Sequence, residues 1–197
     1  MPSELVRRCE VAGYRCLVIA DHADGSLLDF TIPRLARFCK EIAGLVKMKV
    51  KPGVELTHVR PEQYARLTAV ARRLGAEVVL AHGETLVEPV IPGTNRAAIE
   101  AGVDVIGHPG LISVADARLA AKKGVCLEIS GRKGHSLANG HVAATARATG
   151  ASLVFGSDSH SPSDLVPRDF AERIALAAGL SRAEIKRLFE RAEGFFR

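Results

Sequence analysis

The amino-acid sequence predicts an α/β protein built on a parallel sheet that curls into a TIM-like (β/α) barrel. Six short apolar runs, each of a length suited to a buried strand, alternate along the chain with stretches of helical periodicity. Each run is followed at once by a histidine or a carboxylate, as where LVFG leads to Asp158 and His160. Alternating strands and helices imply a parallel sheet, and the absence of a polar edge strand favours a barrel over an open sheet.

The first half of the chain contains three of these helix and strand pairs. Gly13 follows the first helix, and proline suits the first turn of a helix, so Pro33 and Pro61 are expected to start the second and third. The expected helices are 3–12, 33–43 and 61–74, and the expected strands are 14–20, 49–54 and 77–81.

The second half continues the alternation and ends in two helices. Ser113 is expected to cap the helix that ends near Gly124, and Ser181 with Glu184 forms a capping box. The glycines with the position of helix C-caps before strands are Gly75, Gly102, Gly124 and Gly150. The expected strands are 103–107, 125–129 and 153–156, with helices at 96–101, 114–123 and 142–149, after Pro167 and after Ser181.

Length and composition limit the class of protein to which the chain can belong. At 197 residues the chain is expected to form one domain over residues 1–197, long enough to bury about 70% of its unfolded surface. No apolar run approaches the roughly 20 residues of a membrane span, and the start MPSELVRR lacks a signal-peptide core. We therefore expect a cytoplasmic protein without a membrane partner. The four cysteines have no CxxC spacing and lie in apolar stretches, which favours buried reduced thiols.

The formal net charge of +5 would suit an anionic partner such as a nucleic acid or a phosphorylated metabolite. Lysine and arginine, however, are mixed with acidic residues along the helical stretches. The chain has only two tyrosines and no tryptophan for stacking on bases. We interpret most of the charge as solvated helix faces and do not expect nucleic acid as the partner.

The residues at the strand ends form a set of candidate metal ligands. They are His22, Glu55, His82, His108, Asp158 and His160. In a (β/α) barrel the C-terminal ends of the strands share one rim, so these side chains are expected to meet there. Imidazoles and carboxylates without a thiolate suit Zn, Mn or Fe better than Ca or Mg. A lone histidine at such a position is usually only hydrogen-bonded, but four of the seven histidines at strand ends favour a metal site.

A basic, glycine-rich loop, GRKGHSLANG, follows the strand that ends at Ser130. Arg132, Lys133 and His135 are candidate ligands for a substrate phosphate, because Arg offers a bidentate contact and Lys a point charge. A mobile basic surface loop is the equal alternative. His58 is expected in a loop or at a helix lead-in, outside the ligand set.

Six short motifs occur in a fixed order and carry a family resemblance. They are IADH at 19–22, PGVE at 52–55, AH at 81–82, GHPG at 107–110, LEIS at 127–130 and SDSH at 157–160. This series resembles the motifs of the PHP family, which includes polymerase-associated and histidinol-phosphatase domains. The likeness spans nearly the whole chain.

The resemblance implies a distorted seven-stranded barrel with up to three divalent metal ions and phosphoester hydrolysis by metal-activated water. By motif match, Glu55 would bridge two ions, and His82 with His108 would complete the second site. Asp158 would serve the first site, and His22 with His160 the third. On this interpretation the candidate catalytic residues are Glu55, Asp158 and His160.

The sequence departs from the PHP pattern at its start. The family opens with a strand that carries a His-x-His motif, and this sequence has none, so six strands are expected here. The missing motif removes two ligands of the first metal site, and fewer than three ions follow from this. The sheet is also expected to have an unpaired edge, which a partner such as a second copy of the chain would cover.

The resulting functional hypothesis is a metal-dependent phosphatase or phosphoesterase that acts on a small phosphorylated substrate, as histidinol-phosphate phosphatases do. The alternative is a PHP-like accessory module with reduced catalysis that binds a metal or a phosphate. The missing opening motif supports the alternative, and the ligand series supports the enzyme.

Overall fold

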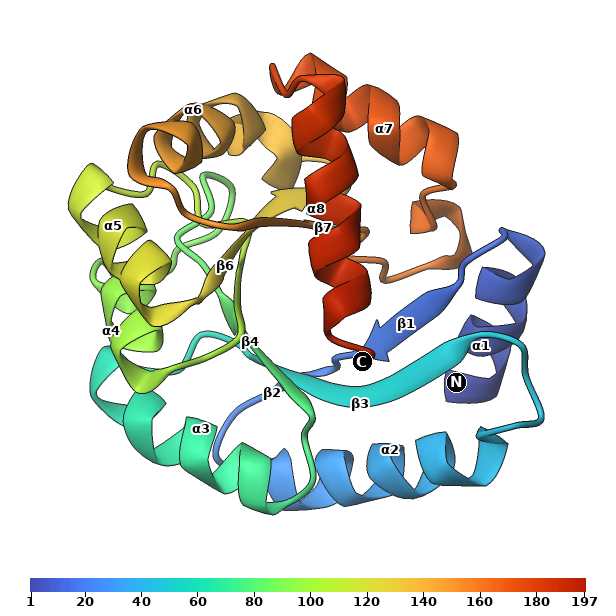
Figure 1. Cartoon of the computed structure of the whole chain (residues 1–197). Coiled ribbons are helices and arrows are strands. Elements are labelled where there is room, and N and C mark those ends of the chain that lie inside the picture. Colours follow the sequence, from blue (N-terminus) through green and yellow to red (C-terminus); the bar gives the residue numbers. More distant parts are fainter.

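A curled parallel sheet with helices on its outer side forms the architecture (Figure 1). The computed structural model describes residues 1–197. The strands are β1 (Cys16–Ile19), β2 (His22–Ala23), β3 (Lys49–Leu56), β4 (Val78–His82), β5 (Val105–Gly107), β6 (Cys126–Ser130) and β7 (Leu153–Gly156). They pair in the order β1-β3-β4-β5-β6-β7, every pair is parallel, and β2 also pairs with β3. The predicted parallel α/β fold of TIM-like kind is therefore confirmed, as an open half-barrel with six strands along its path and the short β2 beside them.

The first predicted strand, 14–20, is shorter in the structure and is followed by a second short strand that was not predicted. Both β1 and β2 pair with β3, and Ala20 and Asp21 lie between them. His22 pairs in register with Glu55. The register of β2 on β3 thus leaves the histidine and the carboxylate side by side at the C-terminal end of the sheet.

Most of the helices lie around the outside of the sheet, whereas α8 crosses in front of it (Figure 1). They are α1 (Pro2–Val11), α2 (Leu28–Ile42), α3 (Tyr64–Arg73), α4 (Thr94–Ala101), α5 (Val114–Lys123), α6 (Asn139–Thr149), α7 (Arg168–Ala177) and α8 (Arg182–Gly194). Three short 3-10 helices, η1 (Pro61–Gln63), η2 (His135–Ala138) and η3 (Pro162–Asp164), lie in the connections. None of the helices is both long and apolar enough to cross a membrane.

The local signals for helix ends are confirmed at most positions. Gly102, Gly124 and Gly150 are C-caps with φ of 74°, 73° and 76°, a conformation that costs glycine little. The Ser113 hydroxyl accepts the Asp116 N–H, and Ser181 forms the expected capping box with Glu184.

The start of the second helix was predicted wrongly. Pro33 lies inside α2, which begins at Leu28. The buried side chains of this helix lie at positions 28, 32, 35 and 39, a spacing that follows one helix face. Burial of Leu28 and Ile32 therefore extends the helix before the proline, against the local preference of proline for the first turn.

The sheet is open between β1 and β7, and we call this opening the seam. The Tyr14 hydroxyl bridges it, because it donates to the Val166 carbonyl at 2.9 Å and accepts the Val166 N–H at 3.0 Å. A cavity of about 840 Å³ is lined by residues of β1 and β7 among others. Phe195 packs against the buried residues Val105, Cys126 and Val154.

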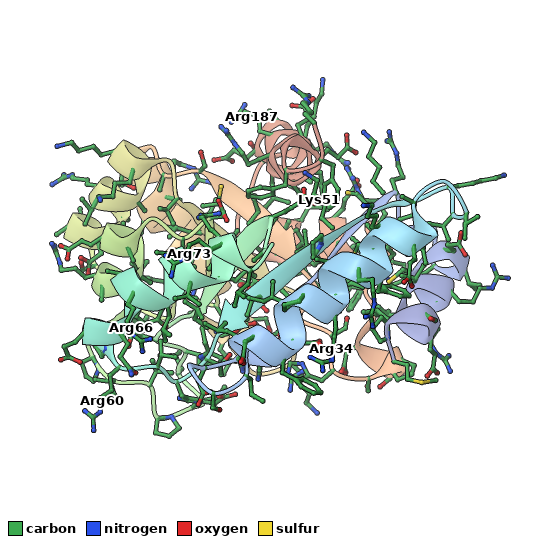
Figure 2. The ribbon with its side chains drawn as sticks, turned by 90° about the horizontal axis from the view of Figure 1, so that it is seen from below. Arg34, Lys51, Arg60, Arg66, Arg73 and Arg187 are labelled. Atoms are coloured by element: carbon green, nitrogen blue, oxygen red, sulfur yellow. The ribbon has the colours of Figure 1, made fainter.

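The basic side chains are spread over the molecule and do not form one patch on the face in Figure 2. Of the labelled residues, four lie on helices, as the sequence predicts for the positive charge: Arg34 on α2, Arg66 and Arg73 on α3, and Arg187 on α8. The other two do not, since Lys51 lies on β3 and Arg60 lies directly before η1. All four cysteines are free, and Cys9, Cys39 and Cys126 are buried.

Candidate metal centre

The C-terminal ends of the strands bring the six predicted ligands to one rim. His22 starts β2, Glu55 lies near the end of β3, and His82 ends β4. His108 directly follows β5, and Asp158 and His160 lie just after β7. Because all strand pairs are parallel, residues separated by up to 138 positions in sequence end on the same side of the sheet.

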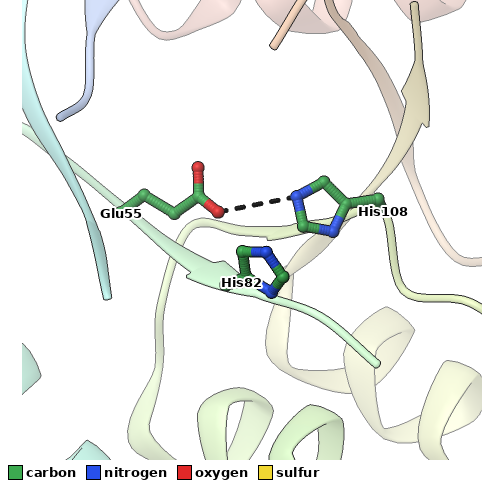
Figure 3. Close-up of side chains that lie close together, drawn as sticks. All are labelled: Glu55, His82 and His108. Carbon is green, nitrogen blue, oxygen red and sulfur yellow. Dashed lines mark ion pairs between the residues drawn. The ribbon is translucent and has the colours of Figure 1, made fainter. Parts of the chain in front are cut away.

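Glu55, His82 and His108 form the inner part of this rim, and all three are buried. Figure 3 shows them facing one another, with the ion pair between Glu55 and His108 drawn. The His108 Nε2 lies 3.5 Å from the Glu55 Oε1, and the ring centres of His82 and His108 are 4.3 Å apart. One ligand atom from each of the three residues lies within 4.8 Å of the others, so the group can hold a metal ion.

Asp158, His22 and His160 surround the inner group. The Asp158 Oδ2 lies 3.7 Å from the His108 Nε2, and the His160 Nδ1 lies 3.4 Å from the Asp158 Oδ1. The His22 Nε2 lies 3.8 Å from the Glu55 Oε2. The rings of His22 and His160 are 5.0 Å apart at their centres and nearly half exposed. These two histidines thus form the solvent side of the rim.

Unpartnered polar atoms show that the inner group fits a cation. Buried atoms without a hydrogen-bond partner include the Glu55 Oε1, the Asp158 Oδ2 and one Nδ1 atom each of His82, His108 and His135. A buried polar atom without a partner costs about 1–3 kcal/mol, and more if it is charged. Carboxylate oxygens and imidazole nitrogens gathered in this way are ligands that zinc, manganese and iron accept.

The electrostatics of the site also favour a cation. Burial and the neighbouring His108 lower the pKa of His82 to about 4, so this imidazole is neutral at neutral pH and can bind a metal. Burial alone would raise the pKa of Glu55, but His108, His22 and His82 hold it below its usual value. Burial and Glu55 raise the pKa of Asp158, as expected for two carboxylates that share a dry site.

The backbone is strained where it carries these ligands. His58, His108 and Asp158 have φ of 51°, 30° and 49°, and they are the only non-glycine residues with positive φ. Such conformations cost about 1–3 kcal/mol each and are concentrated at functional sites. The strain therefore coincides with the residues that the sequence assigns to the site or places beside it.

Glu128 supports the site from below and was not among the predicted site residues. It is buried, and its Oε2 accepts the backbone N–H of His108 at 2.8 Å. Burial raises the pKa of this carboxyl to about 7. Its position at the end of the VCLE run carried the same strand-end signal as the ligands, which was the clue available in the sequence.

Two residues of the basic loop, Arg132 and His135, lie at the rim, and Lys133 does not. Arg132 lies beside the ligands, where its Nη1 donates to the Asp158 carbonyl at 3.2 Å and contacts the His160 ring. His135 is buried among them, with its Nδ1 3.4 Å from the Asp158 Oδ2. Lys133 is exposed and pairs with no carboxylate of the rim. Of the three candidates for phosphate binding, Arg132 alone has the position of a residue at the edge of the metal centre.

The rim also includes two residues, Glu88 and His58, that the sequence analysis did not assign as ligands. Glu88, in the loop between β4 and α4, lies 3.1 Å from the His82 Nε2 through its Oε2. His58 follows β3, and its Nε2 lies 3.1 Å from the same oxygen. The sequence contained no local signal for Glu88, because it lies six residues beyond the end of its strand.

Comparisons with known proteins show one relative and a shared fold. No protein-family model matches the chain. The chain is 39% identical over 194 residues to the uncharacterized protein MJ1295 of Methanocaldococcus jannaschii, with 94% of this chain and 86% of that protein covered.

Two solved structures have a similar fold. The crystal structure of an amidohydrolase has a TM-score of 0.62 and 14% identity, and that of an uncharacterized protein has a TM-score of 0.61 and 14% identity. Each comparison covers 92% of this chain but only 63% of the other, so the chain spans less than two thirds of either protein. At this identity the likeness concerns the barrel fold alone.

Proposed function

Because the chain belongs to the same family as the uncharacterized protein MJ1295, whose name gives no activity, we propose a function from the site itself. The protein is a metal-dependent hydrolase that cleaves a small phosphomonoester, and its half-barrel is of the PHP type. The convergence of Glu55, His82 and His108, with ligand atoms within 4.8 Å, is the main support.

The donor set explains why a metal is central to this proposal. A bound divalent ion supplies Lewis acidity toward a phosphoryl oxygen and lowers the pKa of a water molecule. Glu55 and Asp158 contribute the negative charge that attracts the ion, and His82 contributes a neutral imidazole. Zinc, manganese and iron are the candidate metals, since the donors are nitrogen and carboxylate oxygen.

Arg132 supports a phosphorylated substrate. Its guanidinium lies at the edge of the centre, with the Nε 3.8 Å from the Asp158 Oδ2. Guanidinium groups bind phosphate oxygens in bidentate geometry, so Arg132 is placed to orient a phosphate beside the metal ligands. His160, half exposed and 3.4 Å from Asp158, is placed to carry a proton between this edge and solvent.

The test combines metal analysis with hydrolysis. Protein loaded with Mn²⁺ or Zn²⁺ is assayed for phosphate release from p-nitrophenyl phosphate and from histidinol phosphate. We expect release that a chelator abolishes and the metal restores. His108→Ala should lose both bound metal and activity, because His108 contacts Glu55 and Asp158.

Arg132→Ala separates substrate binding from metal binding. It should raise KM for the phosphomonoester by about 10-fold or more, since a hydrogen bond to a charged group contributes about 1.5–3 kcal/mol, while the metal content stays the same. Arg118→Ala, an exposed arginine on α5, is the matched control and should change neither.

Two outcomes would contradict the phosphatase. Metal-loaded protein that releases phosphate from no phosphomonoester, yet still binds phosphate, would favour the accessory module. Cleavage of simple amides in place of phosphate esters would instead align the chain with the amidohydrolase whose fold it shares.

A further inference from the structure

A second group of potential ligands is centred on the Glu88 carboxylate. Its Oε2 lies 3.1 Å from the Nε2 of His58 and 3.1 Å from the Nε2 of His82. Its Oε1 lies 3.2 Å from the Nε2 of His135. His58 follows β3, His82 ends β4 and His135 follows β6, so three separate parts of the chain direct a nitrogen at one carboxylate.

Hydrogen bonds alone do not account for this arrangement. A neutral imidazole that donates from its Nε2 keeps a lone pair on its Nδ1. The Nδ1 atoms of His82 and His135 are buried and have no hydrogen-bond partner. A carboxylate with three imidazole donors would therefore leave two buried lone pairs unsatisfied, each at a cost of about 1–3 kcal/mol.

If a metal ion binds the Nε2 atoms, the Nδ1 of His135 is no longer an unsatisfied acceptor. Its proton then lies on Nδ1, which faces the Asp158 Oδ2 at 3.4 Å. Metal-binding histidines commonly have a carboxylate opposite the other ring nitrogen, where it fixes the tautomer and the ring orientation. Asp158 would then orient His135.

The spacing of the donors fits a tetrahedral zinc site. Ligands at about 2.0–2.1 Å from a tetrahedral ion lie about 3.3 Å from one another. The distances from the Glu88 Oε2 to the Nε2 atoms of His58 and His82, both 3.1 Å, are close to that value, and these three residues have ligand atoms within 4.8 Å of one another. The Nε2 of His135 lies outside this set of three, 3.2 Å from the other Glu88 oxygen, and is the fourth donor of the site we infer. Three imidazoles and one carboxylate form a donor set that zinc accepts in four-coordinate sites.

The group is buried on one side and open on the other. The side chains of His82 and His135 are 1% and 5% exposed, whereas those of Glu88 and His58 are 35% and 43% exposed. An ion can therefore enter from the solvent side. His58 also adopts the left-handed conformation, with φ of 51°, which holds its ring toward the group.

We propose that His58, His82, Glu88 and His135 form a zinc site separate from the Glu55, His108 and Asp158 group. This site goes beyond the proposed hydrolase, and its zinc content can be measured whether or not the chain hydrolyses a phosphate. His82 lies between the two groups, because it also belongs with Glu55 and His108.

The experiment counts zinc in variants that affect one group at a time. Metal-free protein is titrated with Zn²⁺ by calorimetry, and bound zinc is measured by mass spectrometry after desalting. The wild-type protein should bind two equivalents. His58→Ala and Glu88→Gln should each lose one equivalent and keep the other, and Glu55→Gln should lose the first-site equivalent, because Glu55 contacts none of His58, Glu88 and His135.

Co²⁺ identifies which site each variant keeps. Tetrahedral Co²⁺ absorbs strongly in the visible range, and this absorption should disappear in His58→Ala and remain in Glu55→Gln. His141→Ala is the matched control, since His141 lies on α6 and donates to the Ile112 carbonyl at 2.8 Å. It should keep both equivalents. Circular dichroism confirms folding, which His58 and Glu88 should not limit because both are partly exposed.

The outcomes separate the two proposals. A single equivalent that Glu55→Gln removes and His58→Ala retains would overturn the second site and leave the hydrolase centre intact. Two equivalents retained in both His58→Ala and Glu88→Gln would also overturn it. Loss of one equivalent in these variants, with no phosphatase activity in any form, would support the zinc site and count against the hydrolase.

Discussion

Gly156, at the end of β7, shows how closely the residues beneath the metal centre are fitted. A Cβ atom at this position would lie 1.8 Å from the Glu128 Oε1. The other oxygen of Glu128 accepts the backbone N–H of His108, whose φ is 30°. The absence of a side chain at residue 156 therefore leaves room for the carboxylate that holds a strained ligand in place.

Gly156→Ala should lower the free energy of unfolding by about 1–3 kcal/mol, because the new methyl group displaces Glu128 in a packed interior. It should also weaken metal binding, since Glu128 positions His108. Urea unfolding and zinc titration measure the two effects.

Gly140→Ala is the matched control for this substitution. Gly140 lies in α6, and a Cβ there would meet nothing within 4 Å. It should leave stability unchanged or raise it by up to about 1 kcal/mol, through helix propensity. Equal effects of the two substitutions would show that the contact with Glu128 is unimportant.

At the residue scale the sequence predicted ligands that end strands and missed those held by loops. His82 and His108 follow apolar runs, so their position on the rim depends on strand direction alone. Glu88 reaches the rim through the path of the β4–α4 connection, which no local pattern encodes. His58 depends on a left-handed backbone conformation that histidine adopts only when tertiary contacts require it.

Among the elements, α8 is attached both by apolar packing, since Ile185 and Leu188 are buried in the core, and by charged hydrogen bonds at its start. It packs on β7, where it crosses the front of the sheet in Figure 1. At its start the Glu184 carboxylate accepts the Ser181 N–H at 2.8 Å and the Arg147 Nε at 2.8 Å. Hydrogen bonds from Arg147 and then Ser181 lower the pKa of Glu184 to about 2. This carboxylate links the start of α8 to the end of α6.

Glu184→Gln should lower the free energy of unfolding at pH 7 by about 1 kcal/mol, the typical value of a helix cap with an exposed ion pair. The native pKa is depressed, so the contribution of the carboxylate is complete above its unfolded pKa of about 4.3. It is lost as the pH falls toward 2, and the difference between variant and wild type should shrink over that range. Urea unfolding at a series of pH values provides the measurement.

Glu190→Gln, on the same helix, controls for the loss of a charge. Glu190 pairs only with Lys186, at 3.8 Å, and takes part in no cap. Its substitution should change stability by no more than a few tenths of a kcal/mol at any pH. A Glu184→Gln difference that stayed constant down to pH 2 would contradict the assigned role.

The elements themselves were predictable where local chemistry decides them. Glycine C-caps, Ser113 and the Ser181 capping box mark helix ends because the bonds involved lie within a few residues. The start of α2 was not predictable in this way, since burial of Leu28 and Ile32 against the rest of the fold outweighs the preference of Pro33. The break between β1 and β2 also has no mark in the sequence, where YRCLVIADH reads as one strand and its ligand.

At the scale of the whole molecule, the rim joins segments that the chain order keeps far apart. The inner group alone draws on β3, β4 and the end of β5. Glu55, Asp158 and Glu128 place three buried or largely buried carboxyl groups near one another. Burial, together with repulsion from the neighbouring carboxylates, raises the pKa of Glu128 and of Asp158. A cation at the rim relieves this repulsion and connects the strands that carry the acids.

Zinc should therefore raise the melting temperature. A free zinc concentration of about 100 times Kd adds about 2.7 kcal/mol to the free energy of unfolding. For a chain of this size that corresponds to about 5–10 °C. Differential scanning fluorimetry with zinc and with a chelator measures the shift. His108→Ala should reduce it, and a shift of the same size in this variant would place the stabilising ion elsewhere.

The seam between β1 and β7 has a consequence for how firmly different ligands are held. Glu55, His82 and His108 belong to neighbouring, paired strands, so the backbone ladder fixes their spacing. His22 lies on one side of the seam and His160 on the other, and no ladder hydrogen bond spans the gap between them. We therefore expect an ion held by His22 and His160, which are also nearly half exposed, to exchange with solvent faster than an ion held by the inner three residues.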